Sequence, residues 1–204
     1  TKRFTALCHI VLGASLGLAP IGAWVAVRSL SDPEGTHTIF NHLNLLGEWV
    51  FRKGIGWSAV AELSPWLLGA AVMFWVAGFD VIYALQDDEF DRANKLRSIP
   101  AALGRRKALS IAVLMHLTSF LLFFSFVSSL MDPGFAAYGQ GVGVYTRLEK
   151  LVWAAPFVML VGMAYQHSLV KPDDLSRVNV AFFTVNGVIS VVFGAIFVAA
   201  WLLA

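Results

Sequence analysis

Five long apolar segments dominate the sequence and restrict the folds that it can adopt. They cover about residues 5–27, 63–85, 108–131, 151–170 and 178–204, and Asp80 is the single charged residue in any of them. A helix needs about 20 mainly apolar residues to cross the hydrocarbon core of a bilayer. We therefore expect an all-α fold, a polytopic transmembrane helix bundle with five spans in this chain.

The composition agrees with a membrane protein, because 58% of the residues are hydrophobic and 14% are charged. Soluble domains are nearer to half apolar and a quarter charged. The net charge of +2 is too small to indicate a nucleic-acid partner. Cys8 is the one cysteine, which excludes an internal disulfide. Nothing indicates a second, soluble domain, so we expect residues 1–204 to form a single transmembrane domain.

Two segments between the apolar runs are more polar. Residues 28–62 carry apolar side chains at helical spacing, which favours a short interfacial helix. Residues 132–145 are rich in glycine, which favours a loop.

The distribution of Lys and Arg predicts the orientation in the membrane, because cytoplasmic loops carry an excess of these residues. If the N-terminal end is cytoplasmic, ten basic residues lie inside and five lie outside. The inner set is Lys2, Arg3, Arg92, Lys95, Arg97, Arg105, Arg106, Lys107, Lys171 and Arg177, and the outer set is Arg28, Arg52, Lys53, Arg147 and Lys150. This orientation also places the end of the second span in the cytoplasm.

An acidic cluster lies at that end. On a helix that advances about 100° per residue, Asp80, Asp87 and Asp91 fall within about 40° of one another, with Tyr83 about 60° to one side. Charge at a membrane edge is costly, so it indicates a functional site. Carboxylates in this number suit Mg²⁺, which in turn binds phosphate oxygens. Asp88 and its neighbour Glu89 are expected to point elsewhere.

Basic residues follow the acids, from Arg92 through Arg97 to the run 105–107. A metal and cations together can hold a diphosphate, and they stabilise it as the leaving group from an allylic carbon. The alternative is an ordinary cytoplasmic loop whose basic residues only follow the positive-inside rule.

These residues resemble a known family. The pattern Asp80-x-x-Tyr83-x-x-x-Asp87, with Asp91 four residues on, is similar to the second aspartate-rich motif of the UbiA-type intramembrane prenyltransferases. Residues 1–5 and the Gly-rich span that ends at 19–24 are similar to the segment before that motif. Residues 167–179 and 181–187 resemble the C-terminal hairpin of the bacterial 4-hydroxybenzoate polyprenyltransferase branch, including members assigned to menaquinone synthesis.

The resemblance implies a bundle of nine transmembrane helices around a cavity that holds a polyprenyl diphosphate. Two facing aspartate-rich motifs bind Mg²⁺ and diphosphate, and the allylic cation alkylates an aromatic ring. The implied function is Mg²⁺-dependent transfer of a polyprenyl group to an aromatic acid such as 4-hydroxybenzoate, in ubiquinone or menaquinone biosynthesis at the bacterial inner membrane.

The first motif of the family, Asn-Asp-x-x-Asp-x-x-x-Asp, is absent from residues 1–204. The five spans match the last five of the family. We therefore expect this chain to be the C-terminal part of the enzyme, inactive without the half of its metal site that lies upstream.

The resemblance assigns Asp80, Asp87 and Asp91 to the metal site, with Asp80 and Asp87 as the catalytic pair. Tyr83 matches the tyrosine of the motif. Its phenol can hydrogen-bond the diphosphate, or its ring can stabilise a nearby cation, and a packing role is the alternative.

Three basic residues match diphosphate- or substrate-binding positions. Lys2 and Arg3 precede the first span, and they can hold the diphosphate or the carboxylate of an aromatic acid, which suits the bidentate fork of Arg3. Arg97 matches a basic residue after the motif. For Lys2 and Arg3 the alternative is a role in topology alone.

Polar residues inside the spans have simpler interpretations. His9 and His116 are expected to be packed or hydrogen-bonded rather than catalytic. Asn179 and Asn186 lie seven residues apart, on one face of the last helix, where Asn usually bonds a neighbouring helix.

Other functions remain open at this point. Within the superfamily, protohaem, chlorophyllide, homogentisate, dihydroxynaphthoate or glyceryl phosphate is the alternative acceptor. A cation transporter would use Asp80 and Asp87 for permeation, but it predicts ionisable residues deep in several spans. In a scaffold subunit the acids would be a solvated helix end, and Asp80→Asn would leave function intact.

Overall fold

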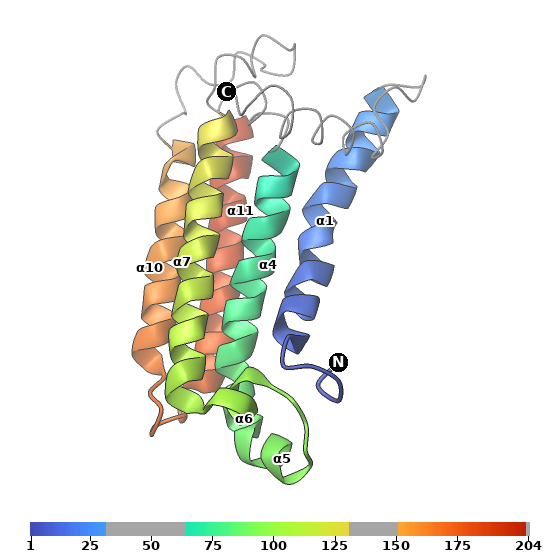
Figure 1. The fold of residues 1–204 in the computed structure, drawn as a ribbon. Helices are drawn as coiled ribbons and strands as arrows, with labels where there is room; N and C mark the ends of the chain where they lie inside the picture. The colour runs from blue at the N-terminus through green and yellow to red at the C-terminus, as the bar shows by residue number, and fades with distance from the viewer. Residues whose placement is uncertain (32–63, 131–150, 203–204) are drawn as a thin grey trace.

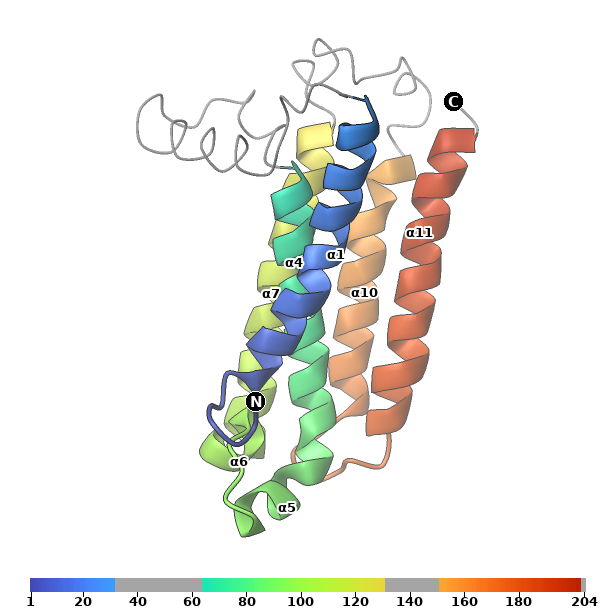
Figure 2. The ribbon, with the colours of Figure 1, turned by 90° about the vertical axis from the view of Figure 1, so that its right-hand side faces the viewer.

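The computed structural model describes residues 1–31, 64–130 and 151–202, and within these ranges the chain forms helices joined by turns. Five long helices lie side by side and run alternately up and down (Figures 1 and 2). They are α1 (Cys8–Ser31), α4 (Ser64–Tyr83), α7 (Arg105–Leu130), α10 (Ala154–Leu169) and α11 (Asn186–Leu202). The expected polytopic helix bundle is confirmed.

Four helical segments are long and apolar enough to cross a membrane, namely Cys8–Val27, Ser64–Ala93, Arg105–Leu130 and Val180–Ala200. The fifth expected span, about residues 151–170, is helix α10, which has 16 residues and is shorter than the other four. The expected loop at 132–145 lies outside the described residues, as does all of segment 28–62 except the last residues of α1.

Small residues bring α1 and α4 into close contact. A Cβ atom on Gly13 would lie 2.2 Å from the carbonyl oxygen of Met73, and one on Gly17 would lie 2.4 Å from the carbonyl oxygen of Gly69. Both distances are too short for a side chain, so the backbones touch only because these positions are glycine. Small residues four apart are the usual means of such packing in membranes. This contact fixes the start of α1 against the end of α4, where the acidic cluster lies.

Short helices form a cap at one end of the bundle. After Tyr83 the chain forms the more tightly wound 3₁₀ turn η2 (Ala84–Asp87). It continues as the short helices α5 (Asp88–Ala93) and α6 (Ile99–Leu103). The N-terminal residues lie at the same end of the bundle (Figure 2).

Ion pairs around a buried carboxylate hold the cap to the bundle. The Asp88 carboxylate is 3% exposed and lies 2.8 Å from Nη2 of Arg105 and 3.0 Å from Nη2 of Arg92. Glu89 extends into solvent and lies 3.2 Å from the same Arg105 nitrogen. Both acids face away from the metal-site candidates, as the helix spacing predicted. Removing Arg105 would leave a buried carboxylate with one partner, so this residue has a structural role beyond topology.

The last span departs from the expected geometry. Residues Val180–Val185 form the π-helical turn η3 before α11 begins. Because a π-helical turn has i→i+5 hydrogen bonds, residues seven apart across it do not share a face. Asn186 is buried and its Oδ1 accepts a 2.6 Å hydrogen bond from Gln166 of α10, whereas Asn179 is exposed. The prediction of a shared face was therefore wrong, while the prediction of an interhelical bond is confirmed for Asn186.

Candidate active site

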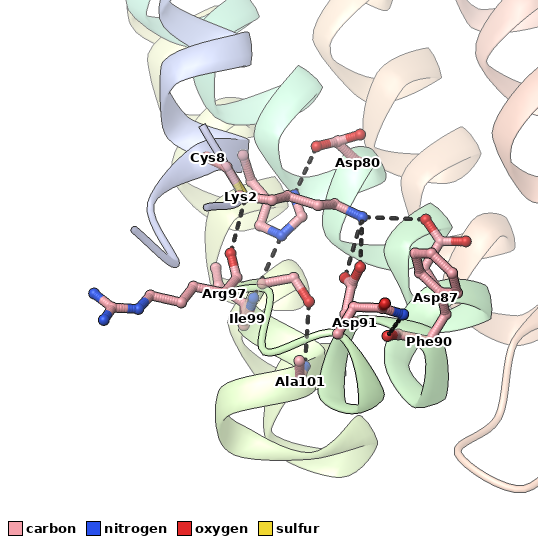
Figure 3. A network of polar contacts seen from close by, with 12 residues as sticks. Lys2, Cys8, Asp80, Asp87, Phe90, Asp91, Arg97, Ile99 and Ala101 are labelled. Atoms are coloured by element: carbon pink, nitrogen blue, oxygen red, sulfur yellow. Dashed lines mark hydrogen bonds and ion pairs between the residues drawn. The ribbon is translucent and has the colours of Figure 1, made fainter. Parts of the chain in front are cut away.

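Two carboxylates meet at one cation where the bundle joins its cap. Nζ of Lys2 lies 3.1 Å from Oδ2 of Asp87 and 3.1 Å from Oδ2 of Asp91 (Figure 3). The Asp91 side chain is 2% exposed and the Asp87 side chain is 52% exposed. Residues four apart on α5 and its preceding turn bring both acids to the same side. The pair is therefore open to solvent on the Asp87 side and closed on the Asp91 side.

The two acids also keep Lys2 charged. Partial burial of Lys2 lowers its pKa, but the hydrogen bonds and negative charge of Asp87 and Asp91 more than offset this, so the net pKa is raised. Lys2 therefore presents a protonated ammonium group at the acidic pair throughout the physiological pH range.

Asp80 has a different partner. Its Oδ2 lies 2.6 Å from Nδ1 of His9, a residue with no exposed surface at the start of α1. The backbone N–H of Ile99 donates to Nε2 of the same ring at 3.4 Å (Figure 3). Because Nε2 accepts, the proton of the neutral ring is on Nδ1 and is donated to Asp80. His9 thus joins the beginning of α1, the end of α4 and the beginning of α6.

Asp87 and Asp91 share one side of the chain as predicted, since both contact Lys2, while Asp80 contacts His9 of the same N-terminal segment. The α-helix ends at Tyr83, and the tighter 3₁₀ turn over residues 84–87 changes the rotation per residue before α5 begins.

His9 was predicted to be packed or hydrogen-bonded, and this is confirmed. Its partner could not be identified, because His9 and Asp80 are 71 residues apart and no local pattern links them. The sequence offered one indication of this pair. His9 and Asp80 lie in neighbouring apolar spans, and the predicted topology places both near the cytoplasmic side of the membrane.

The N-terminal segment is tied to the loop that precedes α6. The backbone N–H of Arg97 donates to the carbonyl of Lys2 at 2.6 Å, and its Nη1 donates to the carbonyl of Phe4 at 3.0 Å. Figure 3 shows the Arg97 guanidinium pointing away from Asp87. The predicted diphosphate-binding residue Arg97 therefore holds the segment that carries Lys2, and its side chain is not among the groups at the acidic pair.

Tyr83 lies in an aromatic cluster. Its ring centroid is 4.2 Å from that of Phe182 and 6.0 Å from that of Phe183, both on η3. Phe79 joins the cluster edge-on to Phe182 at 5.3 Å. The Tyr83 ring therefore packs against the last span about one helical turn beyond Asp80, and its contact with a diphosphate or an allylic cation stays a prediction.

Arg3 does not join the acidic pair. It lines an open cavity of about 590 Å³ at the cap, together with Phe90, Asn94, Lys95 and Leu96. Lys2 therefore contacts the acidic pair, whereas the adjacent Arg3 lines this cavity.

The residues present fit part of a divalent-metal site. Asp87 and Asp91 already converge on one positive charge, and their oxygens are the hard ligands that Mg²⁺ prefers. Within the described residues no group of three or more His, Cys, Asp or Glu side chains surrounds a common point. This chain can therefore supply two carboxylates, and further ligands must come from substrate, from water or from another segment.

The comparison with known families decides the classification. The sequence profile described as the UbiA prenyltransferase family matches residues 1–188. The chain belongs to the UbiA prenyltransferase family. This confirms the resemblance drawn from the second aspartate-rich motif, and members of the UbiA family generally use a divalent metal.

Individual relatives of this UbiA chain are named as 4-hydroxybenzoate prenyltransferases. It is 27% identical over 199 residues to the 4-hydroxybenzoate solanesyltransferase of Synechocystis sp., covering 93% of this chain and 62% of that protein. It is 25% identical over 201 residues to the 4-hydroxybenzoate octaprenyltransferase of Nitrosococcus oceani, covering 95% and 65%. The chain thus spans slightly less than two thirds of the length of these relatives.

A solved UbiA structure shares the fold. The apo structure of a UbiA homolog from Aeropyrum pernix K1 is 30% identical and superposes with a TM-score of 0.61, covering 97% of this chain and 57% of that one. The four helices that are long and apolar enough to cross a bilayer, together with the UbiA family, indicate an integral membrane protein.

Proposed function

We propose that the protein transfers a polyprenyl group from a polyprenyl diphosphate to an aromatic acid such as 4-hydroxybenzoate, as a step of ubiquinone or menaquinone biosynthesis. The observation that carries the proposal is the Asp87–Asp91 pair, which converges on one cation at the membrane edge of a UbiA chain. The names of the relatives support the acceptor.

The residues of this chain have distinct tasks in that reaction. Asp87 and Asp91 would hold Mg²⁺, which when bound neutralises the departing diphosphate. Lys2 places its ammonium group at the same point, where it can stabilise the negative charge of the leaving group. The Tyr83 ring is suited to face a developing allylic cation through its π-electrons. Asp80, which His9 orients, is the remaining predicted metal-site acid and has one oxygen engaged.

The test is turnover of the full-length protein in detergent or nanodiscs with one polyprenyl diphosphate and a panel of acceptors. We expect Mg²⁺-dependent prenylation of 4-hydroxybenzoate to exceed that of homogentisate, dihydroxynaphthoate, chlorophyllide and protohaem. Omission of the metal should abolish transfer. Preferential prenylation of another acceptor would move the protein to a different branch of the family, and transfer to none of them would contradict the enzymatic proposal.

We also propose that the acidic pair faces the cytoplasm at the bacterial inner membrane. The support is the excess of ten Lys and Arg residues against five. A cysteine placed at exposed Arg97 should react with a membrane-impermeant maleimide in inverted vesicles and resist it in intact cells. Labelling in intact cells would reverse the proposed orientation.

A further inference from the structure

The π-helical turn η3 is bound by two side-chain amides in series. The amide nitrogen of Gln166, a residue of α10 with no exposed surface, donates to the carbonyl of Ala181 at 2.9 Å. The same nitrogen donates to Oδ1 of Asn186 at 2.6 Å. Nδ2 of Asn186 in turn donates to the carbonyl of Phe182 at 2.7 Å. Gln166 thus binds two successive carbonyls of the turn, one directly and one through Asn186.

These carbonyls determine the orientation of both amides. A main-chain carbonyl can only accept a hydrogen bond, so an N–H group has to face Ala181 and another has to face Phe182. If the Gln166 amide were turned by 180°, its oxygen would face two acceptors. In the observed orientation Oε1 of Gln166 is buried, and within the described residues it has no hydrogen-bond partner.

This arrangement has an energetic cost that a regular helix would avoid. A buried polar atom without a partner is unfavourable, and such atoms are rare in native proteins. In an α-helix each carbonyl accepts from the N–H four residues on, so no glutamine would be needed. π-helical turns are themselves rare and occur frequently at functional sites. A costly local feature without a structural benefit points to function.

The turn places Phe182 at the centre of the aromatic cluster. Its ring centroid is 4.2 Å from that of Tyr83, 5.3 Å from that of Phe79 and 4.7 Å from that of Phe183. A π-helical turn has more residues per turn than an α-helix, so successive side chains lie less than 100° apart. The rings of Phe182 and Phe183 can therefore both contact Tyr83. We call Tyr83, Phe182 and Phe183 the aromatic wall.

The aromatic wall adjoins the predicted metal-site acids along the chain. Tyr83 lies three residues after Asp80 and four residues before Asp87, which is about one helical turn from each. A polyprenyl diphosphate held at these acids would therefore have its reacting carbon near the wall.

That carbon has two possible fates in the proposed reaction. Its bond to the diphosphate oxygen breaks, and the diphosphate leaves with the electron pair. The allylic cation then bonds a ring carbon of the acceptor, which loses a proton, or it bonds water, which loses a proton and gives a polyprenyl alcohol. Excluding water from a reactive intermediate prevents the second outcome.

We propose that Gln166 is a positioning residue, which holds Phe182 against Tyr83 through the π-helical turn so that the aromatic wall keeps water from the allylic cation. The faces of these rings can stabilise a cation without capturing it. This inference rests on the proposed function. It adds a residue outside the aspartate-rich motif that determines the ratio of polyprenyl alcohol to prenylated acid.

The decisive variant is Gln166→Met in the full-length protein, which keeps the length of the side chain and removes both N–H donors. With saturating polyprenyl diphosphate and 4-hydroxybenzoate, the ratio of polyprenyl alcohol to prenylated acid should rise about tenfold, the range of a lost cation–π contact. Both products come from the same ionisation step, so the ratio does not depend on the amount of folded enzyme. A purely structural glutamine would leave the ratio unaltered.

Variants of Phe182 test whether Gln166 acts through this ring. Phe182→Leu should raise the ratio as Gln166→Met does, whereas Phe182→Tyr keeps a ring and should retain the wild-type ratio. The double variant Gln166→Met/Phe182→Leu should match the more severe single variant, because residues that act through one another are not additive.

Two further variants complete the test. Asn186→Leu removes the donor to the carbonyl of Phe182 and should raise the ratio, and it replaces Gln166→Met if that variant does not fold. Ser168→Ala is the matched control, because the Ser168 hydroxyl is exposed and donates to the carbonyl of Tyr165 within α10. It should leave the ratio unchanged.

The outcomes separate this inference from the proposed function. An unchanged ratio in Gln166→Met, or additive effects of Gln166→Met and Phe182→Leu, would overturn the inference and leave the proposed function intact. If the wild type prenylates a different acceptor, the proposed function fails, and the ratio measured with that acceptor still decides the role of Gln166. If the wild type forms neither a prenylated acceptor nor a polyprenyl alcohol, both are wrong.

Discussion

Replacing Asp91 by Asn is expected to lower the turnover of the full-length enzyme by a factor of about 100 to 1,000, the usual cost of removing a group that stabilises developing charge. The Asp91 carboxylate is 2% exposed and lies 3.1 Å from the Lys2 ammonium, so water cannot readily take its place. Asn keeps the volume and removes the charge. The measurement is initial-rate prenylation over a range of Mg²⁺ concentrations, which should also show a weaker apparent affinity for the metal.

The matched control is Glu89→Gln, which removes a carboxylate from the same short helix. Glu89 is highly exposed and faces Arg105 rather than Lys2, so turnover should stay within about twofold of the wild type, as is usual for a surface charge. Asp87→Asn should resemble Asp91→Asn. If Asp91→Asn kept normal Mg²⁺-dependent turnover while inserted and folded, the metal would have to be bound without this pair.

The residues that lie close together in sequence were the easiest to predict. Asp87 and Asp91 are four residues apart, and any helical turn of that length brings them to one side. The transmembrane helices were predictable for a similar reason, because each apolar run must satisfy its own backbone hydrogen bonds inside a bilayer. Both inferences need only local information.

The error about helix faces arose where the chain leaves regular α-helical geometry. A wider turn at Val180–Val185 separates Asn179 from Asn186. No residue pattern in the sequence predicts this turn. Contacts with another part of the chain accompany it, such as the hydrogen bond between Gln166 and Asn186.

The partner of Asp80 was unpredictable for a different reason. His9 reaches Asp80 because α1 and α4 approach closely at Gly13 and Gly17, which allows a short bond across 71 residues of sequence. A metal site on a helix end needs its carboxylates held in one orientation, and outer-shell donors commonly provide this. The packing of α1 against α4 therefore positions the Asp80 carboxylate through its hydrogen bond with His9.

Replacing His9 by Leu is expected to lower kcat about ten- to a hundredfold, the usual loss when an outer-shell partner is removed. Oδ2 of Asp80 would lose its donor, and the buried N–H of Ile99 would lose its acceptor, so the melting temperature should also fall. His9→Asn keeps a short side-chain N–H for Asp80 and should recover part of kcat, which a purely packing role does not predict. Cys8→Ala, at the adjacent buried residue, is the control and should keep kcat. If His9→Leu and His9→Asn were equally active once corrected for folded protein, orientation of Asp80 would not limit turnover, and His9 would serve only to join α1 to the cap.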